Sequence, residues 1–140
     1  MLSIFLLIHK EIGHDSPYYN YIRCLPTKLN NFPVYYSDQL LEELNGTYFL
    51  SMIKRKKADI EEDFKEIVAI LPSLRHILTY EKFVWARMIV SSRIFGIIIN
   101  GKKTDALVPI ADMLNHKIPK MTSWFFSDER KGFVVQNAEE

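Results

Sequence analysis

The sequence predicts an α+β fold, with helices in the first part of the chain and short strands in the last. Apolar residues recur at helical spacing up to about residue 78, and a largely apolar helix follows them. After Gly96 the pattern changes to short apolar runs separated by turn residues. Helices and strands segregated in this order are typical of the α+β class.

Length and composition allow one compact domain. The chain has 140 residues, 48% of them hydrophobic, which is enough to fill a core. A formal net charge of +1 creates no field that would attract nucleic acid or an anionic membrane, so neither is expected as a partner. The single cysteine excludes an internal disulfide and fits a reducing compartment, the cytoplasm or the nucleus. The apolar run at residues 4–8 is far shorter than the ~20 residues of a membrane span.

Two short helices are expected first. Ser3 can cap the one that carries the apolar residues 4–8, and Gly13 ends it. The second begins at Ser16–Pro17 and ends at Leu25–Pro26.

A longer helical section is expected over residues 37–75, where Leu40, Leu44 and Tyr48 recur at four-residue spacing. The basic run Lys54–Lys57 precedes an acidic run. We interpret both runs as a solvated helix face, and nuclear import or phosphate binding is the alternative for the basic run.

Another helix is predicted from Thr79, as its N-cap, to Gly96. Large apolar residues surround most of its circumference, so it should be largely buried. Arg87 and Arg93 therefore need partners, because burying an unpaired charge is costly.

Two hairpins should follow this helix. Asn100–Gly101 is a strong turn dipeptide between the runs IFGIII and KKTDALVPI, and SWFFSDERKGFVVQ reads as a hairpin that turns near residues 128–132. No closing element follows the last strand, so we expect its partner strand to be missing from this sequence.

The candidate site is a group of polar residues after the apolar run ALVPI. Asp112, Asn115 and His116 follow that run, and Arg93 ends the preceding helix. If residues 111–116 form a helical turn, Asp112 and His116 share one face. These groups either satisfy the backbone of the turn or bind a ligand such as an adenine ring or an amino-acid head group. The residues alone leave both possibilities open.

Several other chemistries lack support. Zinc at Asp112 and His116 would need further ligands, and the remaining histidines have no matching spacing. Ser91 and Ser92 lack the Gly-x-Ser-x-Gly elbow, and Cys24 has no nearby base. We expect no metal.

Two motifs together resemble a known family. WARMIVSSRIF at residues 85–95 and ALVPIADMLNH at residues 106–116 are similar to the C-terminal half of the SET domain in the split-SET methyltransferases. That group includes the Rubisco large-subunit lysine methyltransferase and the actin-histidine methyltransferase. The resemblance is most specific over residues 79–140 and looser over residues 1–78.

The resemblance implies that residues 1–140 are a partial SET domain, with residues 37–75 as a helical insert and residues 79–140 as its C-terminal half. It places the first SET strands before Met1, and the catalytic-tyrosine strand and a substrate-binding domain after Glu140. The chain would then be a fragment that binds cofactor weakly or not at all.

The resemblance also implies S-adenosylmethionine as the cofactor. Asn115 and His116 would hold it, Arg93 would contact its carboxylate, and Asp112 would help to shape the pocket. The reaction would transfer a methyl group to a side-chain nitrogen of a protein substrate, with activity rising with pH until the acceptor is neutral. Lysine is the favoured acceptor, because the histidine enzyme's pattern has tryptophan at the position of Ala111.

Two alternatives remain at this point. The chain could be a catalytically inactive interaction module whose helical insert binds a partner, or an unrelated all-helical protein with accidental motif matches. The sequence sets neither the substrate protein nor the oligomeric state.

Overall fold

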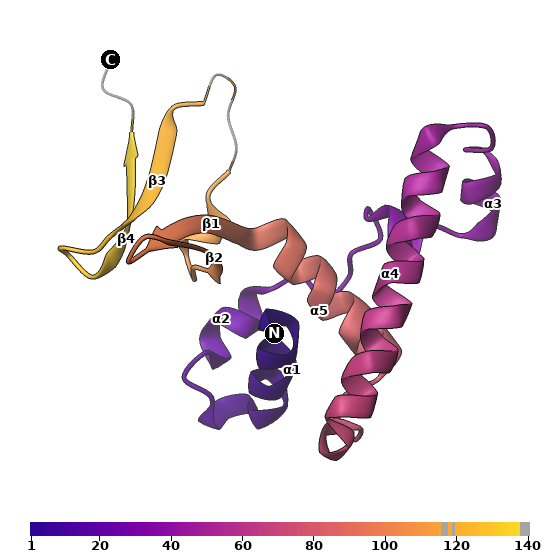
Figure 1. The fold of residues 1–140 in the computed structure, drawn as a ribbon, viewed down its shortest axis with the longest axis horizontal. Coiled ribbons are helices and arrows are strands. Elements are labelled where there is room, and N and C mark those ends of the chain that lie inside the picture. Colours follow the sequence, from indigo (N-terminus) through magenta and orange to yellow (C-terminus); the bar gives the residue numbers. More distant parts are fainter. Residues whose placement is uncertain (116–117, 119, 138–140) are drawn as a thin grey trace. The chain divides into compact units, whose positions relative to one another are not determined.

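The computed structural model describes residues 1–115, 118 and 120–137 (Figure 1). It divides into two compact units, one comprising residues 1 and 3–89 and the other residues 2 and 90–140. Helices precede two antiparallel hairpins along the chain, so the α+β prediction is confirmed and the all-helical alternative is wrong. No helix formed by the described residues is long and apolar enough to cross a membrane.

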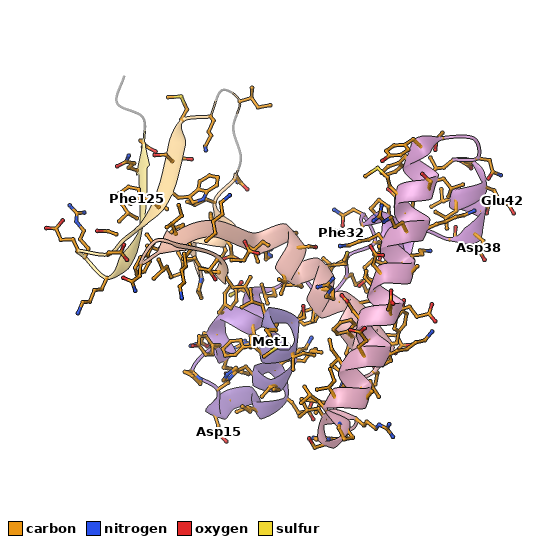
Figure 2. The ribbon with its side chains drawn as sticks, in the orientation of Figure 1. Met1, Asp15, Phe32, Asp38, Glu42 and Phe125 are labelled. Atoms are coloured by element: carbon orange, nitrogen blue, oxygen red, sulfur yellow. The ribbon has the colours of Figure 1, made fainter. Side chains whose placement is uncertain are left out.

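The helices occupy the first two thirds of the sequence. They are α1 (Leu2–Ile12), α2 (Tyr19–Cys24), α3 (Asp38–Glu42), α4 (Tyr48–Ile70) and α5 (Tyr80–Arg93). Asp38 and Glu42 mark the two ends of the short α3 (Figure 2).

Side-chain caps explain where three of these helices begin. The hydroxyl of Ser37 accepts a hydrogen bond from the Leu40 N–H at 3.4 Å at the start of α3. Thr47 caps α4 in the same way, and Thr79 accepts from the Lys82 N–H at 3.3 Å, which confirms the predicted cap of α5.

The predicted Ser3 cap is wrong. Helix α1 begins at Leu2, with Met1 as an N-cap that makes no side-chain hydrogen bond. Ser3 is a buried residue inside the helix, which begins two residues earlier than expected. Gly13 ends the helix with φ 66°, as predicted.

The hydrophobic core of the first unit combines residues from several helices. Helix α5 is buried on most sides, as its composition predicted, whereas α4 contributes only one face. The largest fully buried side chains are Leu6, Ile60, Phe83 and Ile89.

Two hairpins form the second unit. Strand β1 (Ile94–Ile99) pairs with β2 (Lys102–Leu107), and β3 (Thr122–Ser127) pairs with β4 (Gly132–Asn137). Both hairpins were predicted from their turn residues. Asn100 and Gly101 have φ 49° and 75°, the positive values that a two-residue hairpin turn requires.

The two hairpins contact one another through aromatic side chains. The ring of Phe95 on β1 lies 5.5 Å from that of Trp124 on β3 and 4.9 Å from that of Phe133 on β4, centroid to centroid. At the turns, the Asn100 N–H donates to Asp128 Oδ1 at 3.2 Å.

The predicted end of the last helix needs a correction. Helix α5 stops at Arg93 rather than at Gly96, and β1 begins directly at Ile94. Isoleucines favour the extended backbone, and Ile94 pairs with Leu107 across the hairpin, so strand pairing prevails over helix extension here.

Candidate functional site

The candidate site is built around an ion pair between the two motifs. Arg93 is the last residue of α5, and Asp112 lies in the 3₁₀ turn Ala111–Met113. Nη1 of Arg93 donates to Oδ2 of Asp112 at 3.0 Å and to the main-chain oxygen of the same residue at 3.3 Å. The Asp112 side chain is 0% exposed and that of Arg93 is 22% exposed. The predicted need of Arg93 for a partner is confirmed.

A tight turn after β2 presents Asp112 to Arg93. The Asp112 N–H donates to the Val108 oxygen at 3.2 Å, which folds the chain back on itself. Ile110 lies inside this turn with φ 75° and ψ −49°. A β-branched residue is strained in this region, at a cost of about 1–3 kcal/mol. Nothing in the sequence signals the strain, because isoleucine is not a residue typical of such turns.

The helical turn on which a shared face of Asp112 and His116 would depend does not continue past Met113. Leu114 is extended, with φ −66° and ψ 133°, and its N–H donates to the Ala111 oxygen in a 3₁₀ pattern. A segment this short does not gain enough hydrogen bonds to nucleate an α-helix. Because Leu114 is extended, no helix runs from Asp112 through that residue.

The four predicted site residues differ in what the structure says of them. Arg93 and Asp112 are in contact. Asn115 lies three positions beyond Asp112 with an exposed side chain, which is available to a ligand. His116 lies outside the described residues.

The other arginine of α5 takes no part in this site. Arg87 pairs with Asp63 of α4, with Nη2 2.7 Å from Oδ2, and both side chains are more than a third exposed. Its predicted need for a partner is also confirmed. Over the described ranges, no three His, Cys, Asp or Glu side chains gather in a way that could hold a metal ion.

No family model matches the chain. It is 29% identical over 134 residues to the ribosomal lysine N-methyltransferase set10 of Schizosaccharomyces pombe, covering 92% of this chain and 24% of that protein. It is 30% identical over 131 residues to the chloroplastic [fructose-bisphosphate aldolase]-lysine N-methyltransferase of Arabidopsis thaliana, covering 90% and 26% respectively. The chain thus spans about a quarter of the length of these relatives.

Solved structures agree with the sequence comparison. The SET domain of LSMT bound to lysine and AdoHcy matches with a TM-score of 0.70 and 28% identity, over 83% of this chain and 27% of that one. The same domain bound to methyllysine and AdoHcy matches with a TM-score of 0.73 and 26% identity, over 88% and 30%. The resemblance seen in the two motifs is therefore confirmed, and the chain corresponds in sequence and fold to part of a SET domain of the lysine methyltransferase type.

Proposed function

We propose that this chain is part of a protein-lysine methyltransferase that uses S-adenosylmethionine. The observation that supports this most directly is the contact of Arg93 with Asp112, because it joins the Ser-Arg motif to the Asp-x-x-Asn-His motif. The similar sequences are named lysine N-methyltransferases, and the similar structures contain AdoHcy, the product that the cofactor leaves after methyl transfer. None of these names mentions histidine, which supports lysine as the acceptor.

We further propose that residues 37–75 are the helical insert of this SET domain and residues 79–140 its C-terminal half. Helices α3 and α4 fall within residues 37–75. Helix α5 begins at Tyr80, one residue after the start of the second range, and both hairpins follow it within that range. The catalytic tyrosine stays predicted beyond Glu140.

The residues present fit a cofactor that carries a carboxylate and an adenine ring. Only Nη1 of Arg93 is engaged by the described residues, so the N–H groups of Nη2 and Nε can still bind a carboxylate. Asp112 holds the guanidinium in a fixed orientation by a charge-assisted hydrogen bond. The exposed amide of Asn115 offers two donors and one acceptor, and we propose His116 beside it as a further cofactor contact.

The chemistry that follows depends mainly on alignment. When bound, S-adenosylmethionine supplies a sulfonium-activated methyl group that a neutral amine can accept. Arg93, held by Asp112, would fix one end of the ligand, and Asn115 would bind another part of it. Fixing the reactants in this way lowers the entropic part of the barrier, and neither residue needs to exchange a proton.

Cofactor binding is tested by saturation-transfer difference NMR with S-adenosylhomocysteine, a method that detects weak complexes. Arg93→Lys keeps the charge but loses the forked donor geometry, and Asn115→Ala removes the amide, so both should lower the transferred signal several-fold. Arg75→Lys is the matched control, because Arg75 is exposed. With a measurable signal from the parent chain, equal signals from all three variants would remove the assigned cofactor site.

Activity is tested on the chain extended at both ends with the corresponding SET segments of a relative. Tritium from labelled S-adenosylmethionine should appear as methyllysine after acid hydrolysis of the substrate protein. Asn115→Ala should reduce the label, and methylhistidine in place of methyllysine would contradict the proposed acceptor.

A partner-binding role is the second candidate, and one surface supports it. Three large side chains at the start of α4 are exposed, Tyr48 by 81%, Phe49 by 45% and Met52 by 51%. Large apolar side chains gathered on a surface are typical of protein contacts. In the enzyme this surface would contact the protein substrate, whereas in an inactive module it would be the whole function.

The two candidates separate in one experiment. Tyr48→Ser with Met52→Ser should slow methylation of a protein substrate and leave that of a free lysine peptide unchanged. If partner binding falls in a chain that transfers no methyl group in its extended form, the module is the better description. The predicted cytoplasmic or nuclear location stays a prediction, because the similar protein of Arabidopsis thaliana is named as chloroplastic.

A further inference from the structure

The first unit contains two cavities that share part of their lining. They measure about 320 and 330 Å³, and Lys10, Thr27 and Trp85 contribute to both. Each is within the size range of small-molecule sites, which begins near ~300 Å³. We call the three shared residues the junction.

The junction has a defined geometry. Nε1 of Trp85 donates to the main-chain oxygen of Pro26 at 2.9 Å, and only 9% of the tryptophan is exposed, so its ring is held in place. Nζ of Lys10 lies 3.7 Å from the centroid of that ring. Thr27 adds a hydroxyl group that can donate a hydrogen bond. A cation, a hydroxyl donor and an aromatic ring therefore line both cavities at the junction.

The charges around the cavities are mostly positive. Lys28 and Lys82 line the first cavity together with Glu81, and Arg23 lines the second. Lys82 is 3.8 Å from Glu11, a long and exposed ion pair that screens little of its charge. With Lys10, four cationic side chains face a single lining carboxylate.

Lys10 is in an unfavourable position for a cation without a counter-ion. Burial, and next the charge of Lys82, hold the pKa of Lys10 below its ordinary value. An anion at the junction would favour the charged form of Lys10, because its attraction to the ammonium group would offset the cost of burial and the repulsion from Lys82.

The remaining walls are mixed, because Asn30 also lines the first cavity, and His9 and Tyr19 line the second, beside apolar residues. Leu29 and Tyr35 line the first cavity, and Ile22 and Leu25 line the second. A ligand that fits must therefore combine an anionic group with an apolar or aromatic part.

We propose that the junction binds the phosphate group of a small ligand whose apolar part occupies one of the two cavities. A phosphate ester carries a charge of about −1.5 to −2 at neutral pH, so it offsets more of the positive charge here than one carboxylate does, and lysine binds phosphate as a point charge. An acidic protein segment would need a longer groove than two cavities of about 320 and 330 Å³ provide. The site is distinct from the proposed cofactor contacts, because all its lining residues precede Arg93 in the first unit.

The test is a fluorescence titration of the full chain with phenyl phosphate at low salt. Trp124→Phe removes the other tryptophan, so that the signal reports Trp85 alone. A saturable change with a dissociation constant below about 1 mM is expected. Lys10→Gln should weaken binding about tenfold or more, because a hydrogen bond to a charged group is lost. Thr27→Val should weaken it less.

The control is Lys65→Gln, which removes an exposed lysine that pairs with Glu61 and lines neither cavity. It should leave the affinity unchanged, and unchanged circular dichroism spectra would show that every variant folds. Inorganic phosphate should compete with phenyl phosphate. The proposal is overturned if Lys10→Gln and Lys65→Gln bind equally, if no saturation occurs, or if hexaglutamate competes better than phosphate.

Discussion

The Arg93–Asp112 ion pair allows a test of what burial contributes to stability. Asp112→Asn keeps the size of the side chain and removes its charge, so Arg93 loses the carboxylate 3.0 Å from its Nη1. Asp63→Asn makes the same change at the other arginine of α5, where the N···O distance is shorter, 2.7 Å. Distance alone would therefore predict a larger loss at Asp63.

Burial predicts the reverse order. The side chains of the first pair are 0% exposed for Asp112 and 22% for Arg93. Those of the second pair are 35% exposed for Arg87 and 43% for Asp63. Breaking a buried pair costs about 3–5 kcal/mol, because the remaining charge stays desolvated. We expect about 3 kcal/mol for Asp112→Asn, the lower end, since Arg93 can still reach some water. The solvated pair at Asp63 should contribute less than about 1 kcal/mol.

The assay is denaturant unfolding followed by tryptophan fluorescence, to which Trp85 and Trp124 both contribute, and by circular dichroism for the helices. Arg93→Met with Asp112→Leu should recover most of the loss, because an apolar pair leaves no buried charge behind. The reasoning fails if Asp112→Asn lowers the free energy of unfolding no more than Asp63→Asn does, or if the double variant is as unstable as the single one.

Three further changes follow from local geometry. Ile110→Gly should stabilise the chain by about 1 kcal/mol and so raise the midpoint of thermal unfolding, because glycine tolerates φ 75° and Ile110 is 79% exposed. A lower midpoint would show that the backbone at Ile110 is not strained. Thr47→Ala should cost about 1 kcal/mol by calorimetry, since its hydroxyl accepts from the Leu50 N–H, and Thr47→Ser should recover most of it. Burial, and next the charge of Lys82, hold the pKa of Lys10 in the folded chain below 10.5, its ordinary value. Just below pH 10.5 the unfolded chain therefore binds more protons than the folded chain, and the free energy of unfolding rises with pH. Lys10→Gln should flatten this rise in urea midpoints measured across that range, and an unchanged slope would count against it.

Features governed by neighbouring residues were the most predictable from the sequence. Asn100–Gly101 indicated a hairpin because few other dipeptides adopt two positive φ values, and the structure has that turn. Thr79 indicated a cap because its hydroxyl reaches an N–H three residues ahead. The pairing of Arg93 with Asp112 was not predictable from local rules, although the apolar surroundings of Arg93 indicated that some partner was needed.

Features that depend on distant residues escaped prediction. The start of α1 depends on which face packs into the core, so a serine that could have capped the helix is buried within it. Ile110 adopts a backbone that its own side chain disfavours, because the fold around it holds Asp112 in place. The junction brings Trp85 to Pro26, 59 positions away in the sequence, and no spacing rule connects them.

The contact between the two hairpins has a further consequence for the segment between β2 and β3, which carries Asp112 and Asn115. Strand β2 is paired to β1, and β3 is held to β1 through Phe95 and Trp124. The two strands that flank Asp112 and Asn115 are thus both held to β1, which restricts the described residues 108–115 that follow β2. A ligand that binds to these residues loses less affinity to the conformational entropy of ordering them. Its affinity should therefore fall when the aromatic contact at Phe95 is removed, although Phe95 need not touch the ligand.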